Sequence, residues 1–122
     1  KEDLAGGIVI TRGLDGCLWG FTRDEWKSVS ERIASLTMTS AEARRFTRFM
    51  FSSASESIPD RNGRVIIPAK LLQYASITRE VVVAGVMNKI EIWNPENWNE
   101  EQNLATEDPE ALVSQLADLG IL

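Results

Sequence analysis

The chain has 122 residues, 43% of them hydrophobic and 25% charged, with a net charge of −5 and no histidine. This length and balance predict one globular domain and exclude a disordered chain. The missing histidines exclude a Ser-His-Asp triad and a zinc site built on imidazole. No apolar run approaches the roughly 20 residues that a helix needs to span a bilayer. We therefore expect a protein with no membrane partner, no catalysis and no cofactor.

A β-hairpin is predicted first. Residues 8–11 and 18–21 are β-branched, apolar or aromatic, and the "GLDG" between them has turn chemistry. Cys17 lies at the start of the second strand, and a chain without histidine offers the thiol no imidazole base. We interpret Cys17 as a small buried hydrophobe rather than a nucleophile. A single cysteine forms no intramolecular disulfide, which fits a reducing cytoplasm.

Two helices are predicted next. The first covers residues 22–36 and begins at Thr22, which forms a capping-box pattern with Glu25. The second begins at Thr39 or Ser40. The residues expected to face inward from these helices are Trp26, Val29, Ile33, Leu36, Ala43, Phe46, Phe49 and Met50.

The middle of the chain alternates short elements with turns. "ASESIP" at 54–59 predicts a short strand, "DRNG" a turn, and "RVIIP" at 64–68 a buried strand closed by proline. Residues 69–77 predict one or two helical turns. Residues 80–94 predict a second hairpin with "MNK" near its tip.

Two further helices are predicted at the C-terminal end. Asn94 caps the first, with Pro95 at its first position, and Gly120 gives the second its stop signal. The second helix aligns Leu112, Leu116 and Leu119.

Charge is distributed unevenly along the chain. No lysine or arginine follows Lys89, and the acidic residues within 96–122 give this C-terminal end a charge of −7, so residues 1–95 carry +2. These acidic residues are Glu96, Glu100, Glu101, Glu107, Asp108, Glu110 and Asp118. A net-negative protein is not steered to nucleic acid as a whole, so DNA binding would need a local basic patch.

The two hairpin–helix segments superpose with a constant offset of 72, which aligns residues 7–26 with 79–98. Gly13 then aligns with Gly85 and Trp26 with Trp98. We interpret this as an internal duplication within one domain, with half-repeats at 1–53 and 54–122; two generic hairpin–helix units remain the alternative.

The offset also makes a prediction about the start of the chain. The counterpart of Asp60 falls about 12 positions before Lys1, so we expect the first copy's turn and strand to be missing by N-terminal truncation.

The turn at 60–64 has the residues of a DNA contact. Gly63 permits a positive φ and a close approach to a ligand, and Asn62 tolerates such geometry. Arg61 and Arg64 flank the tip, and an arginine fork suits phosphate or the O6/N7 edge of guanine. Asp60 would accept from turn amides or orient an arginine.

Lys70, just beyond this turn, would add a phosphate contact. From the residues alone, a solvated surface turn remains the favoured alternative. Arg44, Arg45 and Arg48 form another basic cluster, for which a solvated helix face is favoured over DNA contact. Trp19, Trp26, Trp93 and Trp98 are interpreted as packing residues rather than base-stacking platforms.

Four segments together resemble the MraZ family of bacterial transcriptional regulators: "ITRGLDGCLWGFTRDEW", "ARRFTRFMFSSASE", "DRNGRVIIPAKLLQYASI" and "EVVVAGVMNKIEIWNPENW". The resemblance covers residues 1–105. It implies an α+β fold of the AbrB/MazE type, in which two tandem half-repeats build a swapped-hairpin β-barrel with flanking helices. It also implies a cytoplasmic, nucleoid-associated regulator of the division and cell-wall gene cluster.

The family assembles into homo-oligomeric rings, octamers or larger, and binds short G-rich direct repeats in promoter DNA through D-x-x-x-R turns. Asp60 and Arg64 match that motif, with Arg61, Asn62 and Gly63 at its variable positions. The first such turn is absent from this chain. The alternative function is an AbrB- or antitoxin-like interaction module that acts through the acidic helices of residues 96–122.

Overall fold

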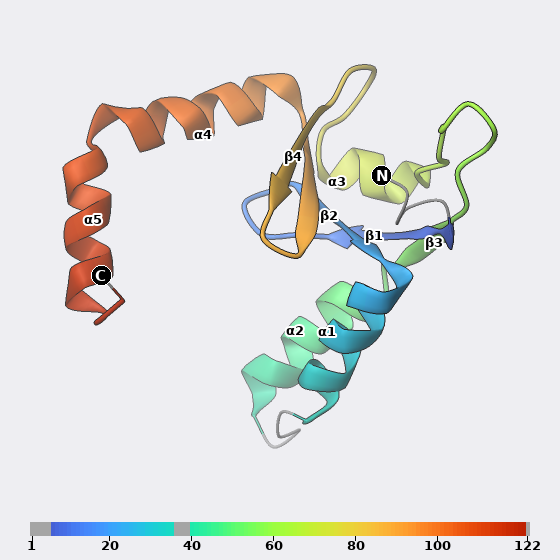
Figure 1. Cartoon of the computed structure of the whole chain (residues 1–122), viewed down its shortest axis with the longest axis horizontal. Coiled ribbons are helices and arrows are strands. Elements are labelled where there is room, and N and C mark those ends of the chain that lie inside the picture. Colours follow the sequence, from blue (N-terminus) through green and yellow to red (C-terminus); the bar gives the residue numbers. More distant parts are fainter. Residues whose placement is uncertain (1–5, 36–39, 122) are drawn as a thin grey trace.

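The computed structural model describes residues 6–35 and 40–121 and has mixed α and β structure (Figure 1). This confirms the predicted α+β class. The elements are β1 (Ile8–Arg12), β2 (Leu18–Thr22), α1 (Arg23–Ser35), α2 (Ala41–Phe51), β3 (Ser55–Ser57), α3 (Ala69–Tyr74), β4 (Val82–Val86), β5 (Lys89–Trp93), α4 (Pro95–Glu107) and α5 (Pro109–Asp118).

The described strands form one five-stranded antiparallel sheet in the order β3-β1-β2-β5-β4. Both predicted hairpins are present, β1 with β2 and β4 with β5. They lie side by side because β2 pairs with β5 at the centre of the sheet. The sheet is open, with β3 and β4 at its edges, so the closed swapped-hairpin barrel stays a prediction.

The central strand pair has approximate two-fold symmetry. Trp19 pairs with Glu91, the residue that lies 72 positions later and is its counterpart in the second half-repeat. On one side of this pair Leu18 pairs with Ile92, the counterpart of Gly20, and on the other Gly20 pairs with Ile90, the counterpart of Leu18. The bounds of α1 and α4 also differ by 72 at both ends. The two half-repeats therefore share one local design and meet along this axis.

One face of the sheet packs against α3. Side chains alternate along a strand, so β1 and β2 send every second residue to this core. Ile10, Leu18 and Leu71 are fully buried in it. The other buried members are Ile8, Ala75, Ile77 and Ile92.

The opposite face is covered by aromatic side chains that repeat at the same offset. In the first half-repeat, Trp26 of α1 packs on Phe21, with ring centroids 5.6 Å apart, and on Phe51 of α2 at 5.0 Å. In the second, Trp98 of α4 packs on Trp93 at 5.7 Å. Packing is thus the role of Trp26, Trp93 and Trp98, as predicted.

Local capping signals explain where the helices begin. Thr22 Oγ1 accepts from the backbone N–H of Glu25, and Ser40 Oγ accepts from that of Ala43. The Asn94 side chain accepts from two first-turn amides of α4. The predicted Leu36 and Thr39 lie outside the described residues.

The segment at 64–68 differs from its prediction. It forms no strand within the described chain, and Ile66 is 80% exposed. A strand needs a paired neighbour, and the bond here to the β3 strand is a side-chain one, from the Ile66 N–H to Ser57 Oγ at 3.1 Å. The prediction of a buried strand is wrong because the apolar run has no ladder to join.

The C-terminal helices extend away from the sheet (Figure 1). Asp108 alone separates α4 from α5, and its carboxylate caps α5 by accepting from the backbone N–H of Ala111. Helix α5 ends at Asp118, and Gly120 follows two residues later with a φ of +78° and its N–H on the carbonyl of Ala117. All ten residues of α5 are exposed.

Candidate nucleic-acid interface

The turn at 60–64 is closed by hydrogen bonds within its own backbone. The Asp60 N–H donates to the Arg64 carbonyl at 2.9 Å, and the Gly63 N–H donates to the Asp60 carbonyl at 2.9 Å. Gly63 has a φ of +79°, the left-handed conformation that favours glycine. Gly63 therefore gives the turn its predicted sharp reversal.

The Asp60 side chain fixes the inside of the same turn. Its Oδ1 accepts from the backbone N–H groups of Asn62 at 2.9 Å and Arg64 at 2.8 Å. Its Oδ2 accepts from Arg64 Nε at 3.0 Å. Asp60 thus performs both local roles expected of it: it holds the backbone and orients an arginine.

These hydrogen bonds hold the pKa of Asp60 below its ordinary value of 3.8, with the Arg64 backbone N–H as the main cause and Asn62 and the Arg64 side chain adding to it. The carboxylate is therefore ionised at neutral pH. Hydrogen bonds to the charged form favour that form, so the turn stays closed over the physiological range.

Arg64 presents the outer part of its guanidinium to solvent. Asp60 holds Nε, while the side chain remains 74% exposed. An arginine carries five N–H donors, so Nε leaves four on the two Nη atoms. A fork of this kind is the donor set that matches a phosphate or a guanine edge. The neighbouring Arg61 and Asn62 are also exposed.

Lys70 lies on α3 rather than on the turn. It is exposed and lines a cleft of about 360 Å³ with Arg12, Ser52 and Tyr74, among others. The structure thus brings Asp60 and Arg64 together and places Lys70 on the adjoining element.

Arg12 is a polar residue that the sequence did not single out. Its guanidinium donates from Nε and Nη2 to the carbonyl of Phe49, at 3.1 and 2.8 Å, and stacks on the Phe49 ring. It therefore joins β1 to the C-terminal end of α2, where a positive charge is favourable. No residue near Arg12 in the sequence indicates this role, because the carbonyl that it binds lies 37 positions away.

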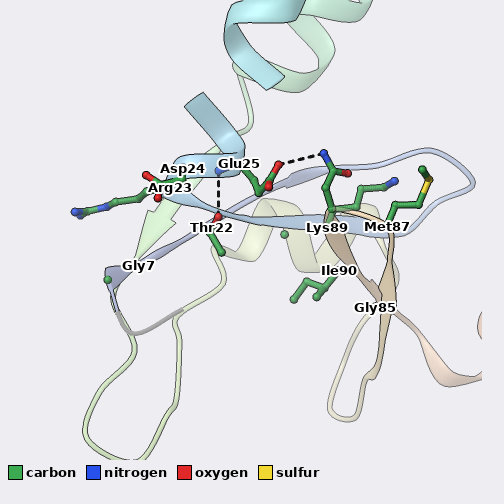
Figure 2. A pocket seen from close by; sticks show the side chains of 12 residues that line it. Gly7, Thr22, Arg23, Asp24, Glu25, Gly85, Met87, Lys89 and Ile90 are labelled. Carbon is green, nitrogen blue, oxygen red and sulfur yellow. Dashed lines mark hydrogen bonds between the residues drawn. The ribbon is translucent and has the colours of Figure 1, made fainter. Parts of the chain in front are cut away.

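The groove between the two half-repeats has two acidic and two basic side chains in its lining. It measures about 720 Å³ and lies between the start of α1 and the tip of the second hairpin (Figure 2). Asp24 and Glu25 line it, and Glu25 Oε1 accepts from Asn88 Nδ2 at 3.3 Å. The guanidinium of Arg23 pairs with Glu56.

Lys89 also lines the groove, with its Nζ 4.8 Å from the centroid of the Trp19 ring. The lining is therefore mixed in charge, and the Glu25–Asn88 bond joins α1 to the second hairpin.

Cys17 is fully buried, as predicted. Burial raises the pKa of its thiol to about 12, with Glu91 and Asp15 adding to the effect. Among residues 6–35 and 40–121, no group of three or more His, Cys, Asp or Glu side chains could hold a metal ion. Within that same part of the chain, no helix is long and apolar enough to cross a bilayer.

The fold and the turn together define a class: a duplicated α+β protein that displays an arginine on a rigid D-x-x-x-R turn. A family model described as "MraZ protein, putative antitoxin-like" matches the chain twice, at residues 1–49 and 50–117. The chain belongs to the MraZ family, and the predicted repeat is confirmed.

Two curated relatives carry the name transcriptional regulator MraZ. One from Clostridium acetobutylicum is 41% identical over 121 residues, which is 99% of this chain and 84% of the relative. One from Caldicellulosiruptor saccharolyticus is 40% identical over 121 residues, covering 99% and 85% of the two chains.

Proposed function

We propose that this protein is a sequence-specific DNA-binding transcriptional regulator of the division and cell-wall gene cluster. The observation that carries the proposal is the Asp60–Arg64 clamp, which fixes an exposed guanidinium on a rigid turn. Membership of the MraZ family and relatives named as transcriptional regulators support it.

In this proposal the turn contacts promoter direct repeats in double-stranded DNA. Arg64 and Arg61 bind phosphate or a guanine edge, and Asn62 and Gly63 let the backbone come close. Lys70 adds a phosphate contact from α3. Phosphate contacts position a protein on the duplex, while contacts with base edges select the sequence.

One turn provides little affinity, because each phosphate contact contributes about one unit to the salt dependence of binding. We therefore include assembly in the proposal: AbrB-type swapped-hairpin barrels, each built from half-repeats 1–53 and 54–122, associate into a ring of eight or more chains. Several turns then engage several repeats at once, and avidity multiplies their separate affinities. The proposed location is the cytoplasm, on the nucleoid.

The test is Arg64→Ala in a mobility-shift assay with promoter DNA, paired with light scattering. We expect specific binding to be lost and the assembled mass to stay unchanged, because the Arg64 side chain is 74% exposed and bonds to Asp60 within its own turn. Binding equal to that of the parent protein would refute the site.

A second candidate function is an antitoxin-like interaction module. The exposed acidic helices α4 and α5, which carry −7 together with Asp108, favour it. Deleting residues 108–122 would then abolish capture of a partner protein and leave DNA binding intact.

A further inference from the structure

The cleft that contains Lys70 lies where strand β1, the end of helix α2, strand β3 and helix α3 meet, and it measures about 360 Å³. Its polar lining comes from Arg12, Ser52, Ser53, Ser55, Lys70 and Tyr74. Among the described residues, no aspartate or glutamate lines it. The cleft therefore gathers two cations and four hydroxyl groups with no carboxylate among them.

Arg12 is already fixed in place at this cleft. Its Nε and Nη2 donate to the carbonyl of Phe49 at 3.1 and 2.8 Å, and its guanidinium carbon lies 4.4 Å from the centroid of the Phe49 ring. Nη1 takes part in neither bond and keeps two N–H donors. Because the side chain is ordered before a ligand arrives, binding costs it little further conformational entropy.

Lys70 supplies the second positive charge. It is exposed on the first turn of α3, and it takes part in neither ion pair of the described residues, which are Arg23–Glu56 and Arg64–Asp60. A lysine ammonium is a point charge with three donors and is a common ligand of phosphate. Two cations without a carboxylate give the cleft a positive potential, which attracts anions.

The hydroxyl groups add both donors and acceptors. Ser52 Oγ accepts from Arg12 Nη2 at 3.4 Å, which leaves its own O–H to donate. Tyr74 donates its O–H to the carbonyl of Gly13 at 2.7 Å, so its oxygen remains as an acceptor. The serine O–H can therefore bind a phosphate oxygen, and the tyrosine oxygen can bind an alcohol.

The cleft has room for more than a phosphate group. Its volume lies at the lower end of the range for small-molecule pockets, which is about 300–1,000 Å³. Pro68 and Leu71 add an apolar wall on the side of α3, against which carbon atoms can pack. The lining thus suits a phosphate carried on a compact organic molecule that has hydroxyl groups of its own.

We propose that this cleft binds a small phosphomonoester of the sugar phosphate class. Arg12 Nη1 and Lys70 hold the phosphate, Ser52 donates to it, and the Tyr74 oxygen accepts from a sugar hydroxyl. The inference goes beyond the proposed function because the ligand is a small molecule and not DNA. Lys70 is the one residue that the two sites share.

Isothermal titration calorimetry on the full chain, in a buffer without phosphate or DNA, tests the site. The probes are glucose 6-phosphate, inorganic phosphate and glucose. We expect saturable binding of glucose 6-phosphate, weaker binding of inorganic phosphate and no binding of glucose. An absence of saturable binding of glucose 6-phosphate would overturn the proposal.

Two variants separate the parts of the ligand. Lys70→Gln removes a charge-assisted contact from an exposed position and should weaken both phosphate probes about tenfold or more. Tyr74→Phe should weaken glucose 6-phosphate and leave inorganic phosphate unchanged, because the tyrosine oxygen is assigned to the sugar. The matched control is Lys27→Gln, at an exposed position of α1 outside the lining, which should bind as the parent does. Circular dichroism checks that each variant is folded, and a folded Lys70→Gln with the parent's affinity would refute the site.

A final titration distinguishes a free phosphomonoester from the phosphates of DNA. If a short duplex without the direct repeats binds in a way that depends on Lys70 while glucose 6-phosphate does not bind, the cleft takes a DNA phosphate and the proposal is wrong. Arg64→Ala lies outside the cleft and should bind glucose 6-phosphate as the parent does. Loss of DNA binding in that variant therefore bears on the 60–64 turn alone.

Discussion

Replacing Arg64 by lysine separates two roles that this side chain could perform on DNA. Arg64 Nε is held by Asp60 at 3.0 Å, which orients the remaining guanidinium donors outward. Lysine keeps the charge but has no planar fork and no Nε for Asp60 to hold. Arg64→Lys should therefore retain phosphate attraction and lose any two-point contact with a guanine.

The expected magnitude follows from the number of turns engaged. A good bidentate contact with a base contributes about 1–3 kcal/mol of discrimination. Two turns on two repeats would thus lose about 2–6 kcal/mol, roughly 30-fold to more than 10⁴-fold in affinity for the repeated box. The dependence of binding affinity on salt concentration should hardly change in Arg64→Lys, because it reports how many phosphates the protein neutralises and lysine keeps the positive charge.

The assay is fluorescence anisotropy with a duplex that carries the repeats and a scrambled duplex of equal composition, at several salt concentrations. Arg64→Ala is the companion variant, and it should also lower the salt slope by about one unit per engaged turn. If Arg64→Lys binds both duplexes as the parent does, base reading by Arg64 is wrong.

Three further predictions concern the turn and the core. In a carbon-13 NMR titration, the Asp60 carboxylate should protonate with a midpoint below pH 3.8, and a midpoint at or above 3.8 would contradict the hydrogen bonding described. Because the folded pKa is depressed, Asp60 stabilises the turn above pH 3.8, and this stabilisation is lost as the pH falls through the folded pKa. Cys17 in the folded protein should react with iodoacetamide at pH 8 about a thousandfold more slowly than an unfolded thiol. The reason is that the thiolate reacts, and a pKa raised from 9.0 to about 12 leaves little of it at pH 8. Rapid labelling would show that the thiol is accessible. Gly13→Ala should lower the free energy of unfolding in urea by about 1–3 kcal/mol, because the new Cβ would lie 2.5 Å from Trp19 Cδ1. The matched control is Gly85→Ala, at the repeat counterpart of Gly13, where a Cβ meets open space and stability should be kept. Equal losses in the two variants would refute this contact.

Features set by neighbouring residues could be predicted from the sequence. Ser40 and Asn94 are predicted to cap helices and stand directly before them, and Gly63 has the positive φ that glycine permits. The closed Asp60–Arg64 turn belongs to the same group, because every hydrogen bond in it spans four positions or fewer.

Features set by distant partners could not be predicted in this way. "RVIIP" has the composition of a buried strand, yet a strand exists only where another strand presents its edge, and Ile66 is left exposed. The role of Arg12 depends on a carbonyl at the end of α2. Likewise, aligned leucines predict helix α5 but do not indicate what its apolar side contacts.

We propose the 60–64 turn as the part of this protein that contacts promoter DNA. Hydrogen–deuterium exchange, measured by mass spectrometry with and without a duplex carrying the direct repeats, tests it most directly. We expect DNA to slow exchange in peptides covering residues 58–70 and to leave exchange in α4 and α5 unchanged. A DNA complex that leaves 58–70 unprotected and protects another surface would contradict it.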